Sequence, residues 1–197
     1  MQKLIRADLF SLEEYAEQRP EFRQRVMLHK KPRRIALGEH LSLCFEDRLT
    51  MQYQVQEMLR VERIFEVAGI EEEIAAYNPM IPDGSNWKAT LMIEYTDIGE
   101  RDIALKKLVG IEDQVVLRIG DNAPLACFPD EDIERSREEK TAAVHFMRYE
   151  LTVADREALA AGAPIIAAVE NAEYPIEPFA LSAESRGSLM ADLALAS

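Results

Sequence analysis

Cysteine is scarce in this chain, because Cys44 and Cys127 are the only two among 197 residues. Neither has a second cysteine or a histidine at the spacing of a zinc ribbon, a thioredoxin-like redox pair or a cysteine-ligated iron–sulphur cluster. The sequence therefore does not favour any of these three kinds of site. Two isolated thiols are typical of a reducing compartment, so we expect a cytoplasmic protein.

Long apolar runs are also missing. No segment reaches the roughly 18 consecutive apolar residues that a membrane-spanning helix needs. The first ten residues, MQKLIRADLF, lack the pattern of a secretory signal. No phosphate-binding glycine loop and no Gly-x-Ser-x-Gly nucleophile motif occur. We therefore expect neither membrane insertion nor a reaction that depends on either of these motifs.

Positive charge is in short supply and unevenly distributed. The formal net charge is -13, which should repel nucleic acid from most of the surface. Seven basic residues nevertheless lie between positions 19 and 34. Such a patch either neutralises the acidic remainder of the protein or forms a docking surface for an acidic partner or ligand. The predicted docking residues are Lys30, Lys31, Arg33 and Arg34.

The chain does contain enough apolar residues for one core, at 48% of the total, and we expect a single domain over residues 1–197. Alternating apolar and polar residues predict hairpins at 33–46 and 114–128 and strands at 87–95 and 143–151. A basic helical segment at 11–31 and a helical tail at 182–196 are expected at the two ends. Short hairpin-connected strands mixed with helices predict an α+β fold with a mainly antiparallel sheet.

A long central helix is predicted from about Leu49 to Val67, and we expect the sheet to pack on it. Glu62 falls among its apolar residues and has no basic residue at helical spacing. Its partner would therefore be an arginine or lysine from a strand, or a metal shared with Glu66 and a histidine, unless that edge is simply exposed. His145 is the candidate histidine, although a histidine in an apolar strand is more often a hydrogen-bonded core residue.

A second group of polar side chains indicates an anion-binding pocket. Some lie on the other side of the central helix, where they either satisfy one another or form a pocket wall. Others belong to the proline-rich loop at 78–88, whose single tryptophan either faces a ligand or fills the core. Guanidinium and ammonium groups recognise carboxylates and phosphates. The predicted ligand contacts are Tyr53, Gln56 and Arg60 of the helix, Asn86, Trp87 and Lys88 of the loop, and Arg148 of the strand at 143–151.

Four runs of the sequence resemble the bacterial domain of unknown function 3501: RPEFRQRVMLHKKPRRIALG, FEDRLTMQYQVQEMLRVERIF, AYNPMIPDGSNWKATLMIEY and EEKTAAVHFMRYELT. The resemblance covers nearly the whole chain, but it brings no catalytic residues, because the family is named for lacking a known activity. Genes of this family are commonly found beside those of rubrerythrin-like di-iron proteins and iron–sulphur oxidoreductases. The resemblance therefore implies a role associated with a redox system.

These observations predict an acidic accessory protein that binds an anionic ligand or an acidic or redox partner and needs no cofactor of its own. The alternative is a metal-dependent enzyme using Glu62, Glu66 and His145, so enzymatic activity stays open. Neither nucleic acid nor a membrane is an expected partner, and self-association into a homo-oligomer is left open. The sequence identifies no substrate.

Overall fold

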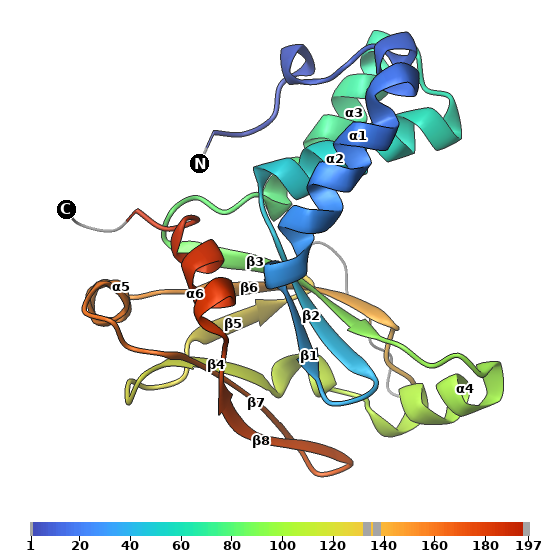
Figure 1. Cartoon of the computed structure of the whole chain (residues 1–197). Helices are drawn as coiled ribbons and strands as arrows, with labels where there is room; N and C mark the ends of the chain where they lie inside the picture. The colour runs from blue at the N-terminus through green and yellow to red at the C-terminus, as the bar shows by residue number, and fades with distance from the viewer. Residues whose placement is uncertain (1, 132–134, 136–138, 195–197) are drawn as a thin grey trace.

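The computed structural model describes residues 2–131, 135 and 139–194 (Figure 1). No helix in this part of the chain is long and apolar enough to cross a membrane. The helices are α1 (Leu12–Lys30), α2 (Arg48–Glu62), α3 (Val67–Tyr77), α4 (Ile98–Lys107), α5 (Val153–Ala160) and α6 (Ala183–Met190), with single turns η1 (Arg6–Asp8), η2 (Lys31–Arg33), η3 (Asn78–Met80) and η4 (Ile111–Asp113). The strands are β1 (Arg34–Leu37), β2 (Leu41–Glu46), β3 (Asn86–Ile93), β4 (Val115–Ile119), β5 (Ala126–Pro129), β6 (Val144–Glu150), β7 (Ile165–Asn171) and β8 (Tyr174–Ala180).

The strands of the described residues form two antiparallel sheets. One has five strands in the order β1-β2-β3-β6-β5, and the other has three in the order β4-β7-β8. Each strand pairs with its neighbours in antiparallel register. The predicted α+β class with a mainly antiparallel sheet is therefore confirmed.

The two sheets share one hydrophobic core. In β3, alternate residues from Trp87 to Ile93 are buried in this core, where they join apolar residues of β4 and β7. Because successive side chains of a strand point to opposite faces, Lys88, Thr90 and Met92 lie on the outer face of the five-stranded sheet. The outer face therefore lies outside the core that the two sheets share.

The first three helices form a helical lobe at one end of the molecule (Figure 1). Within it α2 packs on both α1 and α3. Met51, Val55 and Leu59 of α2 join Ile74 and Ile81 in a hydrophobic cluster that is separate from the core between the sheets. The predicted central helix therefore lies beside the sheet core, where it belongs to the helical lobe, and it does not form the centre of the fold.

Both ends of α2 are set by local backbone chemistry. Asp47 caps its start, because the Asp47 carboxylate accepts from the Thr50 amide at 2.9 Å and the Thr50 hydroxyl accepts from the Asp47 amide at 2.9 Å. Arg63 ends it in the left-handed conformation with a φ of 55°. The helix is thus shorter than the predicted span that reached Val67.

The predicted hairpin at 114–128 is wrong, because β4 and β5 belong to different sheets. The segments touch through a backbone bond from Leu125 N to Leu117 O at 2.8 Å before the chain continues into β5, beside β6. Strand β8 is not among the strands predicted from the sequence, and it contains Pro175 and Pro178. It is an edge strand, where a residue without an amide proton is tolerated.

Candidate functional site

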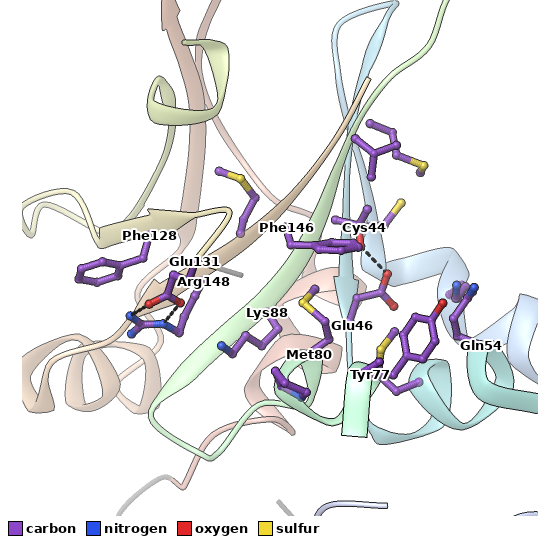
Figure 2. Close-up of a pocket in the computed structure, with 18 residues that line it drawn as sticks. Cys44, Glu46, Gln54, Tyr77, Met80, Lys88, Phe128, Glu131, Phe146 and Arg148 are labelled. Atoms are coloured by element: carbon purple, nitrogen blue, oxygen red, sulfur yellow. Dashed lines mark hydrogen bonds and ion pairs between the residues drawn. The ribbon is translucent and has the colours of Figure 1, made fainter. Parts of the chain in front are cut away.

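A pocket of about 790 Å³ lies between the outer face of the five-stranded sheet and the helical lobe (Figure 2). This volume is in the range that holds small organic ligands. Sheet residues form its floor and residues of α2, α3 and η3 form its wall. The lining consists of Lys30, Cys44, Glu46, Met51, Gln54, Ala76, Tyr77, Pro79, Met80, Lys88, Thr90, Met92, Phe128, Glu131, Val144, Phe146, Met147 and Arg148.

Strand register brings the charged floor residues together. Glu46 of β2 is the cross-strand partner of Lys88 in β3, and Lys88 is in turn the partner of Arg148 in β6. The next row along the strands places Thr90 opposite Phe146. Glu46, Lys88 and Arg148 come from three distant parts of the chain and form one charged row across the sheet. The row beside it contains Thr90 and Phe146.

Like Lys30, which also lines the pocket, Lys88 is a cation that makes no ion pair with the described residues. Its side chain is half-buried and makes no hydrogen bond or ion pair with the residues that the structure describes. Burial lowers the pKa of the Lys88 ammonium, and the neighbouring Arg148 guanidinium lowers it further. An anion placed beside Lys88 would offset both effects.

Arg148, by contrast, is already paired. Its Nε lies 2.6 Å from Oε2 of Glu131 and its Nη2 lies 2.6 Å from Oε1 of the same residue. A further bond runs to the Glu150 carboxylate, and the guanidinium lies 4.2 Å from the centre of the Phe128 ring. The predicted role of Arg148 as an anion contact would require a ligand to displace these acids.

Glu46 is the buried acid of the pocket and is only 5% exposed. It is the last residue of β2, directly before the Asp47 cap, so its backbone position is firmly held. Its Oε1 accepts from the Thr90 hydroxyl at 2.9 Å. Its Oε2 is buried and has no hydrogen-bond partner among the described residues. A buried carboxylate oxygen in this state needs a donor.

The two thiols have raised pKa values, which disfavours the reactive thiolate form at neutral pH. Burial raises the pKa of the Cys44 thiol, which lines the pocket. Burial also raises the pKa of Cys127 to about 12. Both side chains are therefore neutral thiols near pH 7, and thiolates are the reactive form. In the pocket Cys44 acts as a small apolar surface.

The loop residues predicted as ligand contacts are divided by the structure. Lys88 lines the pocket, whereas Trp87 points into the core and its Nε1 donates to the Leu189 carbonyl at 2.9 Å. Asn86 is buried and donates to Oε1 of Glu150 at 3.2 Å. Alternation along β3 thus separates Lys88 from Trp87, whereas Asn86 lies on the same face as Lys88 and is bonded to Glu150.

The three predicted contacts on α2 are outside the pocket lining. Gln56 is fully buried, and its Oε1 accepts from the Phe10 amide at 2.6 Å. Tyr53 packs on an aromatic cluster of α1. Arg60 is exposed and lies 3.3 Å from the Glu57 carboxylate. Gln56, Tyr53 and Arg60 therefore contact neighbouring groups of the protein, which is the alternative to a pocket wall.

Glu62 and Glu66 do not form the predicted metal site with His145. Both glutamates are exposed, because α2 ends at Glu62 and the chain turns at Arg63. Of the described residues, those that could hold a metal as a group of three are Glu112, Asp130 and His145. The buried acid of the pocket is instead Glu46, which lies on the same face of β2 as Cys44.

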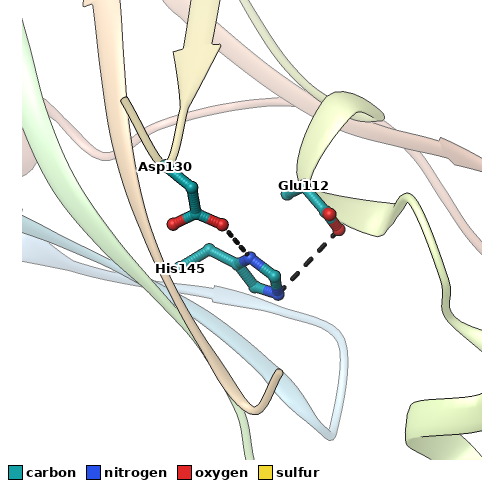
Figure 3. A group of neighbouring side chains, drawn as sticks. All are labelled: Glu112, Asp130 and His145. Atoms are coloured by element: carbon teal, nitrogen blue, oxygen red, sulfur yellow. Dashed lines mark hydrogen bonds and ion pairs between the residues drawn. The ribbon is translucent and has the colours of Figure 1, made fainter. Parts of the chain in front are cut away.

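His145 lies in a buried polar network with two acids (Figure 3). Its Nδ1 is 2.6 Å from Oδ2 of Asp130, and its Nε2 is 3.9 Å from Oε2 of Glu112. Nε2 also lies 2.9 Å from the Thr141 hydroxyl oxygen and 3.1 Å from the Ala142 carbonyl oxygen. Two carboxylates and an imidazole in this arrangement suit either a proton on Nε2 or a cation near it.

Arg33 is not part of an exposed docking surface, contrary to the prediction. Arg33 is 1% exposed, and its Nη2 lies 2.5 Å from Oδ2 of Asp192, so it fastens the region after α6 to η2 and cannot contact a partner. Lys30 lines the pocket and Lys31 is exposed. Arg34 is exposed but pairs with an acid that follows β3. Docking at the exposed residues stays a prediction.

The fold and pocket define an antiparallel α+β protein with a site of ligand size. Residues 3–193 match the family model for the protein of unknown function DUF3501, so the chain belongs to this family and the predicted resemblance is confirmed. The chain is similar to a crystal structure of a novel protein of unknown function from Burkholderia pseudomallei. The two chains are 47% identical, with a TM-score of 0.93 over 98% of this chain and 100% of the other. The comparison with curated proteins finds no match.

Proposed function

We propose that this protein is a cytoplasmic accessory protein that binds a small organic anion in the pocket, with Lys88 as the anion contact. The observation that carries this proposal is a half-buried ammonium group without an ion pair among the described residues, in a pocket of about 790 Å³. Methionine and phenylalanine side chains around it favour an apolar ligand body. The ligand is then an amphipathic carboxylate or phosphate.

The proposal is tested by thermal unfolding and titration calorimetry with aliphatic and aromatic carboxylates and phosphate monoesters. A ligand present at a hundred times its Kd should stabilise the protein by about 2.7 kcal/mol. Lys88→Met keeps the length of the side chain and should weaken binding at least tenfold. Lys31→Met is the matched control, because Lys31 is exposed and outside the pocket lining. Equal binding by both variants would contradict the proposal.

A partner protein remains part of this proposal through the exposed basic residues. Lys31 and Arg34 are both exposed and follow one another closely after α1. Charge reversal at both positions should reduce co-purification with a rubrerythrin-like or iron–sulphur partner of the kind that the family resemblance implies. Lys107→Glu, an equally exposed position on α4, is the control. Unchanged recovery would remove docking from the proposal.

A metal-dependent enzyme is the second candidate, supported by Glu112, Asp130 and His145. In it Asp130 would orient the imidazole through Nδ1, while Nε2 and the Glu112 carboxylate would bind the ion. Elemental analysis of protein purified without chelator tests this candidate. One transition metal per chain, lost in His145→Ala and kept in Glu62→Gln, would support it. No stoichiometric metal in the wild-type protein would contradict it.

A further inference from the structure

The pocket contains an acidic group without a full set of partners, and this group lies apart from Lys88. Glu46 and Lys88 are cross-strand partners, so their Cα atoms are neighbours. Their charged ends nevertheless form no ion pair within 4.0 Å, unlike the other charged neighbours Arg148 and Glu131. Figure 2 shows the Lys88 side chain extending towards Arg148 and Glu131, and the Glu46 carboxylate turned towards the side where Gln54 and Tyr77 lie.

Each charged group has a chemical need that the other does not meet. The Lys88 ammonium lacks an acceptor among the described residues, and Oε2 of Glu46 is buried without a donor there. Both residues line the same pocket. Leaving a buried polar atom unpaired costs free energy, and the cost is greater for a charged group. One molecule that offers an acceptor at one end and a donor at the other would satisfy both.

The surface between these two groups is apolar. Met80 and Phe146 lie between Lys88 and Glu46 in the view of Figure 2, and both line the pocket. The neutral thiol of Cys44 adds to this surface. A ligand that reaches from one charged group to the other therefore needs an uncharged, apolar middle.

We propose that the ligand of this pocket is amphoteric, with an ammonium or similar N–H donor at Glu46, a carboxylate or phosphate at Lys88, and an apolar body between them. This inference rests on the proposed function and adds the second point of recognition. Glu46 accepts from the donor end of the ligand through Oε2 while Oε1 keeps its bond to Thr90. Such a site discriminates against simple fatty acids, which leave Oε2 of Glu46 without a donor, and against simple amines, which leave the Lys88 ammonium without an acceptor.

The test compares ω-amino alkanoates of increasing length with alkanoates and alkylamines of equal length by titration calorimetry. At the best length the wild-type protein should bind the ω-amino alkanoate at least tenfold more tightly than either relative, which is the effect of about one charged hydrogen bond. This comparison needs no variant. Equal affinity for the ω-amino alkanoate and the alkanoate at every length would overturn the inference.

Two variants of similar side-chain size test whether Glu46 and Lys88 cause the preference for the ω-amino alkanoate. Glu46→Gln keeps an oxygen for Thr90 and should abolish the preference for the ω-amino alkanoate over the alkanoate, with alkanoate affinity retained. Lys88→Met should abolish the preference for the ω-amino alkanoate over the alkylamine. A preference for the amino group that survives in Glu46→Gln would overturn the inference and leave the proposed function standing. The failure of every anion to bind, with Lys88→Met indistinguishable from wild type, would overturn both.

Discussion

Lys88 and Arg148 are direct cross-strand partners, yet Arg148 is held by two glutamates while Lys88 has no direct acidic contact among the described residues. The two neighbouring cations therefore differ in what they contribute to stability. Arg148 and its two glutamates stabilise the fold around β6. Burial of the Lys88 ammonium does not stabilise the fold, because the charge is partly desolvated without a partner. Binding of an anionic ligand would stabilise the charge in this position.

Removal of the Lys88 charge should not weaken the unliganded protein. We expect Lys88→Met to leave the free energy of unfolding unchanged or to raise it by up to about 1 kcal/mol, because a desolvated ammonium is lost. Arg148→Met should lower it by about 1 to 2 kcal/mol, because two glutamates lose their partner and the contact with Phe128 is lost. Urea unfolding at pH 7 measures both, and the reverse order would contradict this assignment.

Acid should loosen the contact between α1 and α2 through Glu57. Hydrogen bonds from Arg19 and then from Tyr15 outweigh burial and lower the pKa of Glu57 to about 2. A carboxyl group whose pKa is lower in the folded state stabilises the fold fully above its unfolded pKa, near pH 4.5, and this contribution is lost as the pH falls towards 2.

Glu57→Gln should therefore lower the free energy of unfolding by roughly 2 kcal/mol at pH 7, with a difference from wild type that shrinks towards zero near pH 2. Urea unfolding across this pH range measures the effect. Glu62→Gln is the control on the same helix, because Glu62 is exposed, and its effect should stay within about 0.5 kcal/mol. A pH-independent difference for Glu57→Gln would contradict the assignment.

Arg33 should be essential for attaching the region after α6. Its guanidinium donates to Asp192, to the Phe45 carbonyl at 3.1 Å and to the Glu46 carbonyl at 3.2 Å, all in a buried environment. Arg33→Met should cost about 3 to 5 kcal/mol, because it leaves a buried carboxylate unpaired. Limited proteolysis should then cut near α6. The neighbouring exposed Lys31→Met is the control, and similar stability of the two variants would contradict the role.

The bond between Asp130 and His145 should hold the end of β5 against β6. Asp130 also accepts from the Phe146 amide at 2.9 Å, so its two carboxylate oxygens contact two successive residues of β6. Asp130→Asn should lower the free energy of unfolding by about 3 kcal/mol and speed amide exchange in β5. The exposed pair of Arg34 and Glu94 is the comparison, where Arg34→Ala should cost less than about 1 kcal/mol. Equal losses would contradict the prediction.

The faces of the strands could be predicted from the sequence, and with them most of the polar row in the pocket. Alternation assigned Glu46 and Cys44 to one face of their strand, Lys88 to one face of the next, and Arg148 with Phe146 to one face of a third. What alternation does not contain is which strands are neighbours and in which register. The pairing of Glu46 with Lys88 joins residues 42 positions apart in the chain, and that of Lys88 with Arg148 joins residues 60 positions apart.

The candidate acid was therefore assigned to the wrong element. Glu62 resembled a lone buried carboxylate because a continued helix would have enclosed it, but Arg63 turns the chain and exposes it. Glu46 is the residue that fits this description, and its burial depends on the helical lobe that covers the sheet. The sequence around Glu46 contains no pattern that predicts its burial by the helical lobe.

The sequence by itself determined the features that depend on interactions between residues close in the chain. The helical segment predicted at 11–31 forms α1, which starts at a capping box of Ser11 and Glu14, and the alternating segments form strands. Hydrogen bonds and side-chain periods within a few residues decide both. Only the tertiary structure decided the partners of the charged groups: Asp192 for Arg33 and Asp130 for His145. These partners meet because the whole chain packs into one core, so no local pattern can specify them.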